Sequence, residues 1–355
     1  MELMLQRTLK NRISCTGIAL HTGVAVSMTL HPAPADTGIW FLRSDVAPGI
    51  ARVQARWDRV KSSSLCTMIG NEFGTSVMTI EHLMAAFAGC GIDNAVVELN
   101  GPEVPAMDGS AHPFVLLMEC AGTVQQESPR RVLRVLHPVE VADGDRRATL
   151  RPSHEFRIDF EIDFDGPSGV HQRRTFRGAE RTFKEEIGRA RTFGFAHEVD
   201  AMRAKGLARG GSLENAIVMD EFRILNSGGL RYRNEFVRHK ILDAMGDLYL
   251  IGHPLLASYT AHKSGHGLNN KLLRALLADD SAYEIVSFEN AAAAPAAAPK
   301  APPAGAKAPA PAAGAGTRTG IMSGAVQNAV VNAPEWATLE EARKRQFEAP
   351  DLPQT

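Results

Sequence analysis

RHKILDAMGDLYLIGHPLLASYTA, residues 238–261, begins with a helical pattern of apolar residues and ends with an alternating strand pattern, with a turn between them. The earlier stretch EHLMAAFAGCGIDNAVVELN, residues 81–100, has the same order of helix, turn and strand, and a histidine stands near the start of each helix. This repetition predicts that the chain contains two related α+β units. If the units face one another, His82 and His239 meet in a shared cleft, since ligand sites favour such interfaces.

The other strand and helix patterns fall on either side of a polar, proline-containing break at 125–131, QQESPRR. We therefore expect an α+β fold with two domains, residues 1–126 and residues 131–290. The length agrees, because 355 residues allow two cores of the usual size. The predicted elements are a strand at 24–32, a helix at 81–89 and a strand at 94–100, followed by strands at 131–141, 147–152 and 156–164, a helix at 236–252 and a strand at 256–262.

Composition and charge argue against several classes of partner. With 22% charged residues and a formal net charge of −1, the chain has no overall field that would attract nucleic acid or a membrane surface. The four cysteines are scattered, without a Cys-x-x-Cys pair, which is typical of a reducing compartment. The first residues lack an export-signal pattern, and no apolar run reaches the ~18 residues of a membrane span. We expect a cytoplasmic protein without stable membrane insertion.

The composition changes abruptly after residue 290. Residues 291–316 are fifteen Ala, six Pro, three Gly and two Lys, which predicts a disordered linker because nothing large is available to bury. Beyond it, Thr338 and Glu341 have the spacing of a capping box before a short helix that ends near Phe347. Residues 317–355 are therefore an extension, in which so short a helix is marginal when isolated.

His239 and Asp243 predict a metal site on the second of the matched helices. Side chains four residues apart on a helix lie on one face, about 5–6 Å apart at Cβ, so that both can hold one cation. His82, on the first of the matched helices, is the best candidate for a third ligand. Two imidazoles and one carboxylate leave a fourth position open for water, as in catalytic zinc sites. Zinc lowers the pKa of water bound to it to about 7, which makes hydroxide available for attack on an amide.

Acid and base candidates surround these ligands. Glu81 is adjacent to His82 and can take a proton from water at the metal, so we expect it to be the general base. His266 lies in HKSGHGLNN, where flanking glycines predict a loop that approaches the cleft closely, and it is the candidate general acid and oxyanion stabiliser. Asp247 lies on the same helical face as His239 and can accept a hydrogen bond from His266, which favours the imidazolium form.

Three further residues have both a functional and a structural interpretation. Thr192 in RARTFGF can donate to a developing oxyanion, or it can be a plain turn or cap residue. Lys240 can meet phosphate or sugar oxygens, or it can be a solvated helix charge. Cys66 in SSSLCTMIG is most simply a small buried hydrophobe.

The same residues lie in long motifs that closely resemble those of the bacterial UDP-3-O-acyl-N-acetylglucosamine deacetylases, the zinc amidases that commit the pathway to lipid A. The resemblance covers about residues 5–290. It runs in order through TLKNRISCTGIALHTG (8–23), LCTMI (65–69), TIEHLMAAFAGCGIDNAVVELNGPEVPAMDGSAHPF (79–114), RARTFGF (189–195), GGSLENAIV (210–218), LRYRNEFVRHKILDAMGDLYL (230–250) and AHKSGHGLNNKLL (261–273).

The resemblance implies a fold, a reaction and a set of residues. The implied fold is two similar two-layer α/β sandwich domains, each with a sheet on two helices and a small insert, with the active site at their interface. The implied reaction is hydrolysis of the acetamide of UDP-3-O-(3-hydroxyacyl)-N-acetylglucosamine to the free amine and acetate in the bacterial cytosol. The implied roles are Zn²⁺ ligation by His82, His239 and Asp243, catalysis by Glu81, His266, Asp247 and Thr192, and substrate contacts by Lys240 and Phe193, with His21 and Cys66 near the site.

The resemblance also assigns the second insert to the acyl chain of the substrate. The matching stretch is GFAHEVDAMRAKGLARGG, residues 194–211, in which Phe195, Val199 and Met202 recur at helical spacing and Gly211 closes the segment. Simple packing of an amphipathic helix would explain the same spacing. If the stretch is the passage, each buried CH₂ of the acyl chain contributes roughly 0.8 kcal/mol, so that chain length is selected.

The extension past residue 290 departs from the usual core of the family. The C-terminus of some relatives controls proteolysis, and we therefore expect a protease to recognise this tail. We expect the protein to be a monomer.

Two alternative functions are weighed against the deacetylase. Two histidines and a carboxylate also suit Fe²⁺, as in non-haem iron oxygenases. Those ligands usually occur as His-x-Asp on strands, whereas His239 and Asp243 have helical spacing, which counts against an oxygenase. A non-catalytic sensor of nucleotide sugars or lipids would need a damaged site, yet every proposed catalytic position has a competent side chain.

Overall fold

The first half of the chain forms a five-stranded sheet in the order β2-β3-β9-β4-β5. Its central strand β9 is antiparallel to β3 and parallel to β4. One helix, α1, precedes β9 in the chain and a second, α2, follows it. The elements are β2 (Ile13–Ile18), β3 (Ala25–Pro32), β4 (Ile39–Arg43), β5 (Arg52–Gln54), α1 (Glu81–Cys90), β9 (Ala95–Leu99) and α2 (His112–Ala121).

The second half repeats this topology element by element. Its central strand β18 is antiparallel to β13 and parallel to β14, with α5 before it in the chain and α6 after it. The predicted duplication is therefore evident in strand order and direction. The elements are β12 (Val139–Asp143), β13 (Arg146–Pro152), β14 (Arg157–Phe164), β15 (Val170–Arg177), α5 (Glu235–Tyr249), β18 (Leu255–His262) and α6 (His266–Leu277).

Each half also has an outer antiparallel strand pair. β1 (Leu5–Leu9) pairs with β10 (Thr123–Pro129), and β11 (Arg131–Val135) pairs with β19 (Tyr283–Ser287). β11 also pairs with β18, so that the second sheet has seven strands. Most of the polar stretch at 125–131 is thus part of a strand pair.

The structure is a computed structural model and describes residues 4–164, 170–178, 180–220 and 223–287. These residues belong to one compact unit, Met1–Ala296. The predicted linker at 291–316, and the extension with the capping box of Thr338 and Glu341, lie outside the described residues. Among the helices described, none is long and apolar enough to cross a membrane.

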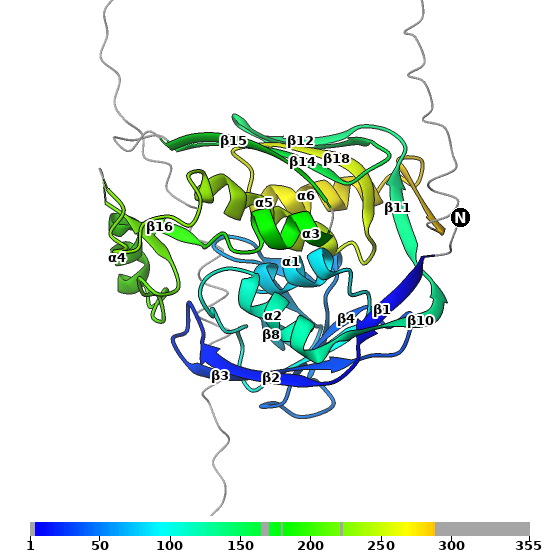
Figure 1. Cartoon of the computed structure of the whole chain (residues 1–355), viewed down its shortest axis with the longest axis horizontal. Coiled ribbons are helices and arrows are strands. Elements are labelled where there is room, and N and C mark those ends of the chain that lie inside the picture. Colours follow the sequence, from blue (N-terminus) through cyan, green and yellow to red (C-terminus); the bar gives the residue numbers. More distant parts are fainter. Residues whose placement is uncertain (1–3, 165–169, 179, 221–222, 288–355) are drawn as a thin grey trace, which may run out of the picture. The chain divides into compact units, whose positions relative to one another are not determined.

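The helices of the two halves lie between the two large sheets (Figure 1). α1 packs against α5, α5 packs on β14 and β15, and α6 packs on β12 and β13. Because α1 is covered on all sides, nearly every one of its residues is buried, which explains why its sequence is apolar around its whole circumference. The main hydrophobic core is continuous through this layer and includes Phe87 and Phe114 of the first half and Phe160 and Leu242 of the second. The α+β prediction is confirmed.

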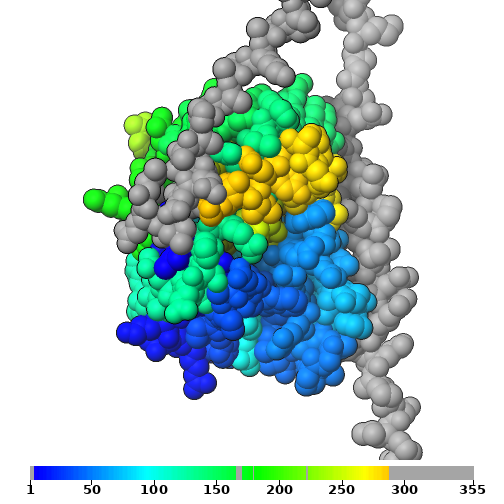
Figure 2. All heavy atoms as spheres, turned by 90° about the vertical axis from the view of Figure 1, so that its right-hand side faces the viewer, coloured from blue at the N-terminus to red at the C-terminus, as the bar shows by residue number. Residues whose placement is uncertain are grey.

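A second contact between the halves lies at the surface. Asn270 of α6 donates a hydrogen bond to the carbonyl of Trp57 at 2.8 Å, and the Arg274 guanidinium lies 5.5 Å from the centre of the Trp57 ring. Figure 2 shows blue atoms of the first half against yellow atoms of the second half at the surface. Residues 57–59 form a 3₁₀ turn that leads into the first insert.

Both halves carry an insert before the central helix, as predicted. The first is a three-stranded antiparallel sheet of β6 (Val60–Ser62), β7 (Met68–Gly70) and β8 (Ser76–Val77). The second contains the parallel strands β16 (Phe193–Phe195) and β17 (Ile217–Met219), with helix α4 (Ala196–Ala204) between them. A short helix α3 (Glu180–Thr182) and a π-helical turn at 183–187 precede this insert.

One strand prediction is wrong. The strand expected at 131–141 is two strands, β11 and β12, which lie in different parts of the sheet. Pro138 stands between them and has no N–H to donate to a neighbouring strand, so the ladder cannot continue through it. The other predicted strands and helices occur where the sequence placed them, within a few residues at their ends.

Gly246 sets how closely α1 and α5 approach. A Cβ at this position would lie 2.0 Å from the carbonyl oxygen of Glu81 and 3.0 Å from the amide nitrogen of Ala85. Both atoms are backbone, so they cannot move without moving α1. The missing side chain therefore brings the start of α1 directly onto the face of α5 that holds Asp243 and Asp247.

We expect Gly246→Ala to lower the free energy of unfolding by about 3 kcal/mol or more, because the overpacking is against backbone. It should also weaken metal binding, since it separates His82 from His239. Denaturant unfolding and metal analysis measure the two effects. Gly228→Ala is the control, because a Cβ there meets nothing within 4 Å. Equal stability of the two variants would contradict the proposed close approach.

Candidate active site

The central helices bring His82, His239 and Asp243 together. One ligand atom from each lies within 4.8 Å of the others, and all three side chains are buried. Asp243 Oδ1 is 3.5 Å from His82 Nε2 and 3.3 Å from His239 Nε2. The two imidazole rings meet edge to face with centroids 4.9 Å apart. The three predicted ligands, from opposite halves of the chain, therefore converge on one point.

A backbone hydrogen bond fixes the orientation of His239. Its Nδ1 donates to the carbonyl oxygen of Ala190 at 3.0 Å, which leaves Nε2 directed toward Asp243 and His82. Burial lowers the pKa of His239 to about 4. The ring is therefore neutral at pH 7 and offers the lone pair of Nε2 as a ligand.

The carboxylate of Asp243 has one satisfied and one unsatisfied oxygen. Oδ2 accepts a hydrogen bond from Lys240 Nζ at 2.7 Å. Oδ1 is buried and has no hydrogen-bond partner among the described residues. Burial alone would raise the pKa of Asp243. The neighbouring His239 and Lys240 nevertheless hold this pKa well below its usual range.

This donor set fits a divalent metal ion. An ionised carboxylate oxygen without a partner lies between two imidazole nitrogens, and a buried group of this kind is costly unless something pairs with it. Two imidazoles and a carboxylate are ligands that Zn²⁺ and Fe²⁺ both accept. The geometry thus supports a metal centre without deciding between the two ions.

A buried ion pair ties the segment before β16 to the start of α5. Glu235 Oε1 accepts from the backbone N–H of Arg191 at 3.0 Å and from its Nε at 2.9 Å. The same carboxylate accepts from the backbone N–H of Arg231 at 2.5 Å. Because Arg191 lies next to Ala190 and Thr192, this pair holds both the carbonyl that orients His239 and the predicted oxyanion donor beside α5.

Glu81, the first residue of α1, is buried beside the metal ligands. Its Oε2 accepts a hydrogen bond from the backbone N–H of Thr67 at 3.0 Å, and its Oε1 is 3.9 Å from His266 Nε2. Burial raises the pKa of Glu81, and only part of this effect is offset by the nearby histidines. A raised pKa suits a group that must accept a proton and release it again.

His266 lies opposite Glu81 and is held by Asp247. Its Nδ1 donates to Asp247 Oδ2 at 2.8 Å, so that Nε2 faces the metal site. Although burial alone would lower it, the charge and hydrogen bond of Asp247 raise the pKa of His266 to about 9. The ring is therefore an imidazolium at pH 7, as the sequence predicted. The expected loop is wrong, however, because His266 is the first residue of α6.

The sequence did not identify the groups that hold Asp247. Asn269 Nδ2 donates to Asp247 Oδ2 at 2.7 Å, and Thr67 Oγ1 donates to Oδ1 at 2.5 Å. Asn269 is fixed in turn by the hydroxyl of Tyr259 at 2.6 Å and that of Ser264 at 3.0 Å. Asn269 stands three residues after His266, a helical spacing that could have suggested it. Thr67 is far from Asp247 in sequence and carries no such signal.

Thr192 and Phe193 lie at the start of the second insert, and Phe193 contacts the metal ligand His239. The Thr192 N–H donates to the carbonyl of Gly109, and its own carbonyl accepts from Ile217 N–H, both at 2.8 Å. The Phe193 ring meets the His239 ring edge to face at 6.1 Å. Both residues are half-buried, so their side chains keep some access to solvent or substrate.

His21 and Cys66 are buried in the first half. Neither ring nitrogen of His21 has a hydrogen-bond partner among the described residues, and burial lowers its pKa despite the nearby charge of Glu103. Burial, followed by the charge of Glu81, raises the pKa of Cys66 well above its usual value. Cys66 is thus a protonated, buried thiol near the base, as expected of a small hydrophobe.

The predicted acyl passage lies on the second insert. The Phe195 ring packs edge to face on Phe164 at 5.8 Å, and Val199 and Met202 of α4 are half-buried. No side chain of α4 is fully buried. The N–H of Gly211 donates to the carbonyl of Ala208, which forms a turn between α4 and β17. The helix therefore presents apolar atoms that the other described residues leave partly uncovered.

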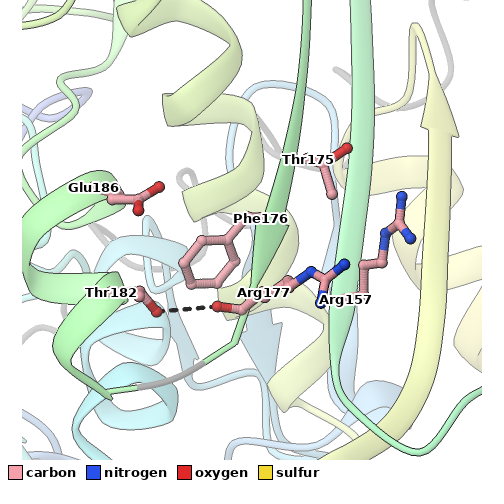
Figure 3. A pocket seen from close by; sticks show the side chains of 6 residues that line it. All are labelled: Arg157, Thr175, Phe176, Arg177, Thr182 and Glu186. Atoms are coloured by element: carbon pink, nitrogen blue, oxygen red, sulfur yellow. Dashed lines mark hydrogen bonds between the residues drawn. The ribbon is translucent and has the colours of Figure 1, made fainter.

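A separate cavity of about 520 Å³ lies between β14, β15 and the turn that follows β15 (Figure 3). Figure 3 shows that its walls combine two guanidinium groups with two threonines, and that Thr182 donates to the carbonyl of Arg177. None of the residues of the metal site lines it. The lining residues are Arg157, Thr175, Phe176, Arg177, Thr182 and Glu186.

Comparisons with known proteins agree with this geometry. The model of the LpxC family, described as UDP-3-O-acyl N-acetylglycosamine deacetylase, matches residues 6–278. Proteins named UDP-3-O-acyl-N-acetylglucosamine deacetylase from Shewanella oneidensis and Shewanella baltica are each 48% identical over 295 residues. These matches cover 82% of this chain and 96% of each relative. The matched part contains all the residues of the metal site.

Proposed function

Because the chain belongs to the LpxC family of UDP-3-O-acyl N-acetylglycosamine deacetylases, we propose that its metal site hydrolyses the acetamide of an acylated UDP-N-acetylglucosamine. The chain is a deacetylase of lipid A biosynthesis. The observation that supports the site most strongly is the buried Asp243 Oδ1 between His82 and His239. We propose Zn²⁺ as the ion, with Fe²⁺ as the second candidate, since three protein ligands and one open position are typical of catalytic zinc.

The bound metal would polarise the acetamide carbonyl and make water acidic enough to attack at neutral pH. His82, His239 and Asp243 would hold the ion, and Lys240 keeps Asp243 oriented through Oδ2. Lys240 remains the proposed contact to the nucleotide-sugar part of the substrate. Phe193, which lies against His239, is proposed to contact the same part.

Glu81 is proposed as the base that takes the proton of the attacking water. Because Thr67 occupies Oε2, the proton goes to Oε1, which is the oxygen facing His266. Burial raises the pKa of this carboxyl and so strengthens it as a proton acceptor. The acetamide carbon gains the oxygen of water, and its carbonyl oxygen becomes an oxyanion, for which Thr192 is the proposed donor.

His266 is proposed as the acid that completes the cleavage. Its Nε2 carries a proton at pH 7 and faces the cleft, because Asp247 holds Nδ1. Transfer of this proton to the nitrogen of the acetamide lets the C–N bond break, which gives the amino sugar and acetate. An imidazolium also stabilises the negative charge of the oxyanion before the bond breaks.

Mass spectrometry of acetate release tests this function. UDP-3-O-acyl-N-acetylglucosamine substrates of graded acyl length are incubated with the protein, with and without a chelator. We expect release that the chelator abolishes and that Zn²⁺ restores. The preferred length reports on the passage proposed at Phe195, Val199, Met202 and Gly211, and His21 and Cys66 are proposed to lie near the site. No release from any substrate would contradict the proposal.

The turnover of the enzyme should fall as pH rises through about 9, because His266 loses the proton that it donates. Although burial alone would lower the pKa of His266, Asp247 raises it to about 9. Asp247→Asn removes this charge and should move the alkaline limb of kcat to lower pH, by roughly 1–3 units. Profiles of kcat against pH measure the shift. Glu161→Gln is the control, because the Glu161 carboxylate pairs with His171 at the surface. An unmoved limb in Asp247→Asn would contradict the assignment of His266.

The alternative functions receive no support from the relatives, which carry the deacetylase name. The ligands His239 and Asp243 lie on a helix, unlike the strand motif expected of an iron oxygenase. Other parts of the proposal rest on the sequence alone. They are a cytoplasmic location, a monomeric state and recognition of the tail by a protease.

A further inference from the structure

We propose that Thr67 is a positioning residue that links the base Glu81 to the acid His266. The inference rests on the proposed roles of those two residues. Thr67 lies in the first insert, just before β7, and only 2% of it is exposed. Its backbone N–H donates to Glu81 and its hydroxyl donates to Asp247, so that one residue contacts both carboxylates of the acid–base machinery.

The first contact determines which carboxylate oxygen of Glu81 is free to accept a proton. The Thr67 N–H donates to Glu81 Oε2 at 3.0 Å, and the Thr67 carbonyl accepts from the N–H of Ile80 at 3.4 Å. Ile80 is the residue before Glu81, so the backbone of Thr67 is hydrogen-bonded to two consecutive residues at the start of α1. The carboxylate plane of Glu81 is thereby fixed, with Oε1 turned toward His266.

The second contact fixes the carboxylate that holds the acid. Thr67 Oγ1 donates to Asp247 Oδ1 at 2.5 Å, which leaves Oδ2 for His266 Nδ1 at 2.8 Å and Asn269 Nδ2 at 2.7 Å. With both oxygens occupied, the carboxylate cannot rotate without breaking a buried hydrogen bond. The position of His266 Nε2 relative to Glu81 Oε1 therefore depends on Thr67.

The residue type suits this task. The branched Cβ of threonine restricts χ1, so the hydroxyl stays directed at Asp247 once the backbone is fixed. Valine has nearly the same shape without the donor, whereas serine keeps the donor without the methyl group. These two substitutions separate the hydrogen bond from the packing.

Thr67→Val should lower kcat roughly 10- to 100-fold, in the range usual for partners of active-site ligands, with KM and metal content unchanged. Thr67→Ser should recover most of the loss. Thr75→Val, at another buried threonine of the same insert, is the matched control and should leave kcat unchanged. If Thr67→Val has normal kcat, or if Thr67→Ser is as impaired as Thr67→Val, the hydroxyl has no positioning role.

A double-mutant cycle distinguishes positioning from a structural effect. If the hydroxyl acts through Asp247, Thr67→Val should change kcat little in an Asp247→Asn background, because the carboxylate that it orients is already lost. Additive losses would overturn the proposal. Failure of the proposed function is recognised separately, since the unaltered protein would then release no acetate, and failure of the proposed acid would leave His266→Ala and Asp247→Asn with full kcat. If kcat falls in the His266 and Asp247 variants but stays normal in Thr67→Val, the acid assignment stands and only the positioning role of Thr67 is refuted.

Discussion

Glu81→Gln is expected to lower kcat by about 10²- to 10⁴-fold while the metal stays bound, because positioned proton transfer contributes this much. Glutamine has the size of glutamate and can still accept from the Thr67 N–H through its carbonyl oxygen. It cannot take a proton from water at neutral pH. The loss should therefore appear in kcat, with the metal ligands His82 and Asp243 undisturbed.

Steady-state kinetics and metal analysis by mass spectrometry measure these effects. Glu98→Gln is the matched control, since Glu98 lies on β9 and pairs with His31 at the surface of the sheet. It should keep both metal and turnover. Full activity in Glu81→Gln would contradict the assignment of the base, whereas loss of metal would show that Glu81 contributes to ligation.

His239→Ala is expected to abolish metal binding first and turnover as a consequence. The variant removes one of the three proposed ligands and leaves His82 as the other imidazole beside Asp243 Oδ1 among the described residues. Metal polarisation supplies several kcal/mol of transition-state stabilisation, so kcat should fall by at least about 10³-fold. Metal content per chain should drop from about one toward zero.

Thermal unfolding adds a readout that does not depend on activity. Metal at 100 times its Kd stabilises the folded state by about 2.7 kcal/mol, so a chelator should lower the Tm of the unaltered protein. The Tm of His239→Ala should not respond to the chelator. His154→Ala, at an exposed position, is the control and should respond as the unaltered protein does. A His239→Ala variant that retains metal would contradict the ligand set.

The repeated helix and strand pattern was readable from the sequence because it is local. α1 and α5 are each largely apolar stretches of helical length, and β9 and β18 follow them at a distance typical of a short turn. The pair His239 and Asp243 was readable for the same reason, since helical geometry alone places residues four apart on one face. His82 required one further step, the recognition that the two units are related.

The sequence was less informative where a contact depends on residues far apart. The periodic pattern within 131–141 did not show that Pro138 would divide it into two strands of different position. The glycines around His266 suggested a loop, although the residues after it form a helix with an apolar face buried on β12 and β13. Local propensity was overruled by tertiary packing in this case.

By itself, the sequence determined the elements, their duplication and the types of side chain at the metal site, because each depends on neighbouring residues. Only the tertiary structure decided how the acid and the base are held. Thr67 and Asp247 are 180 residues apart, and no periodicity links them. Their contact exists because Gly246 lets α1 approach α5 and the first insert then covers that crossing. Long-range pairings of this kind follow from packing, which no local pattern encodes.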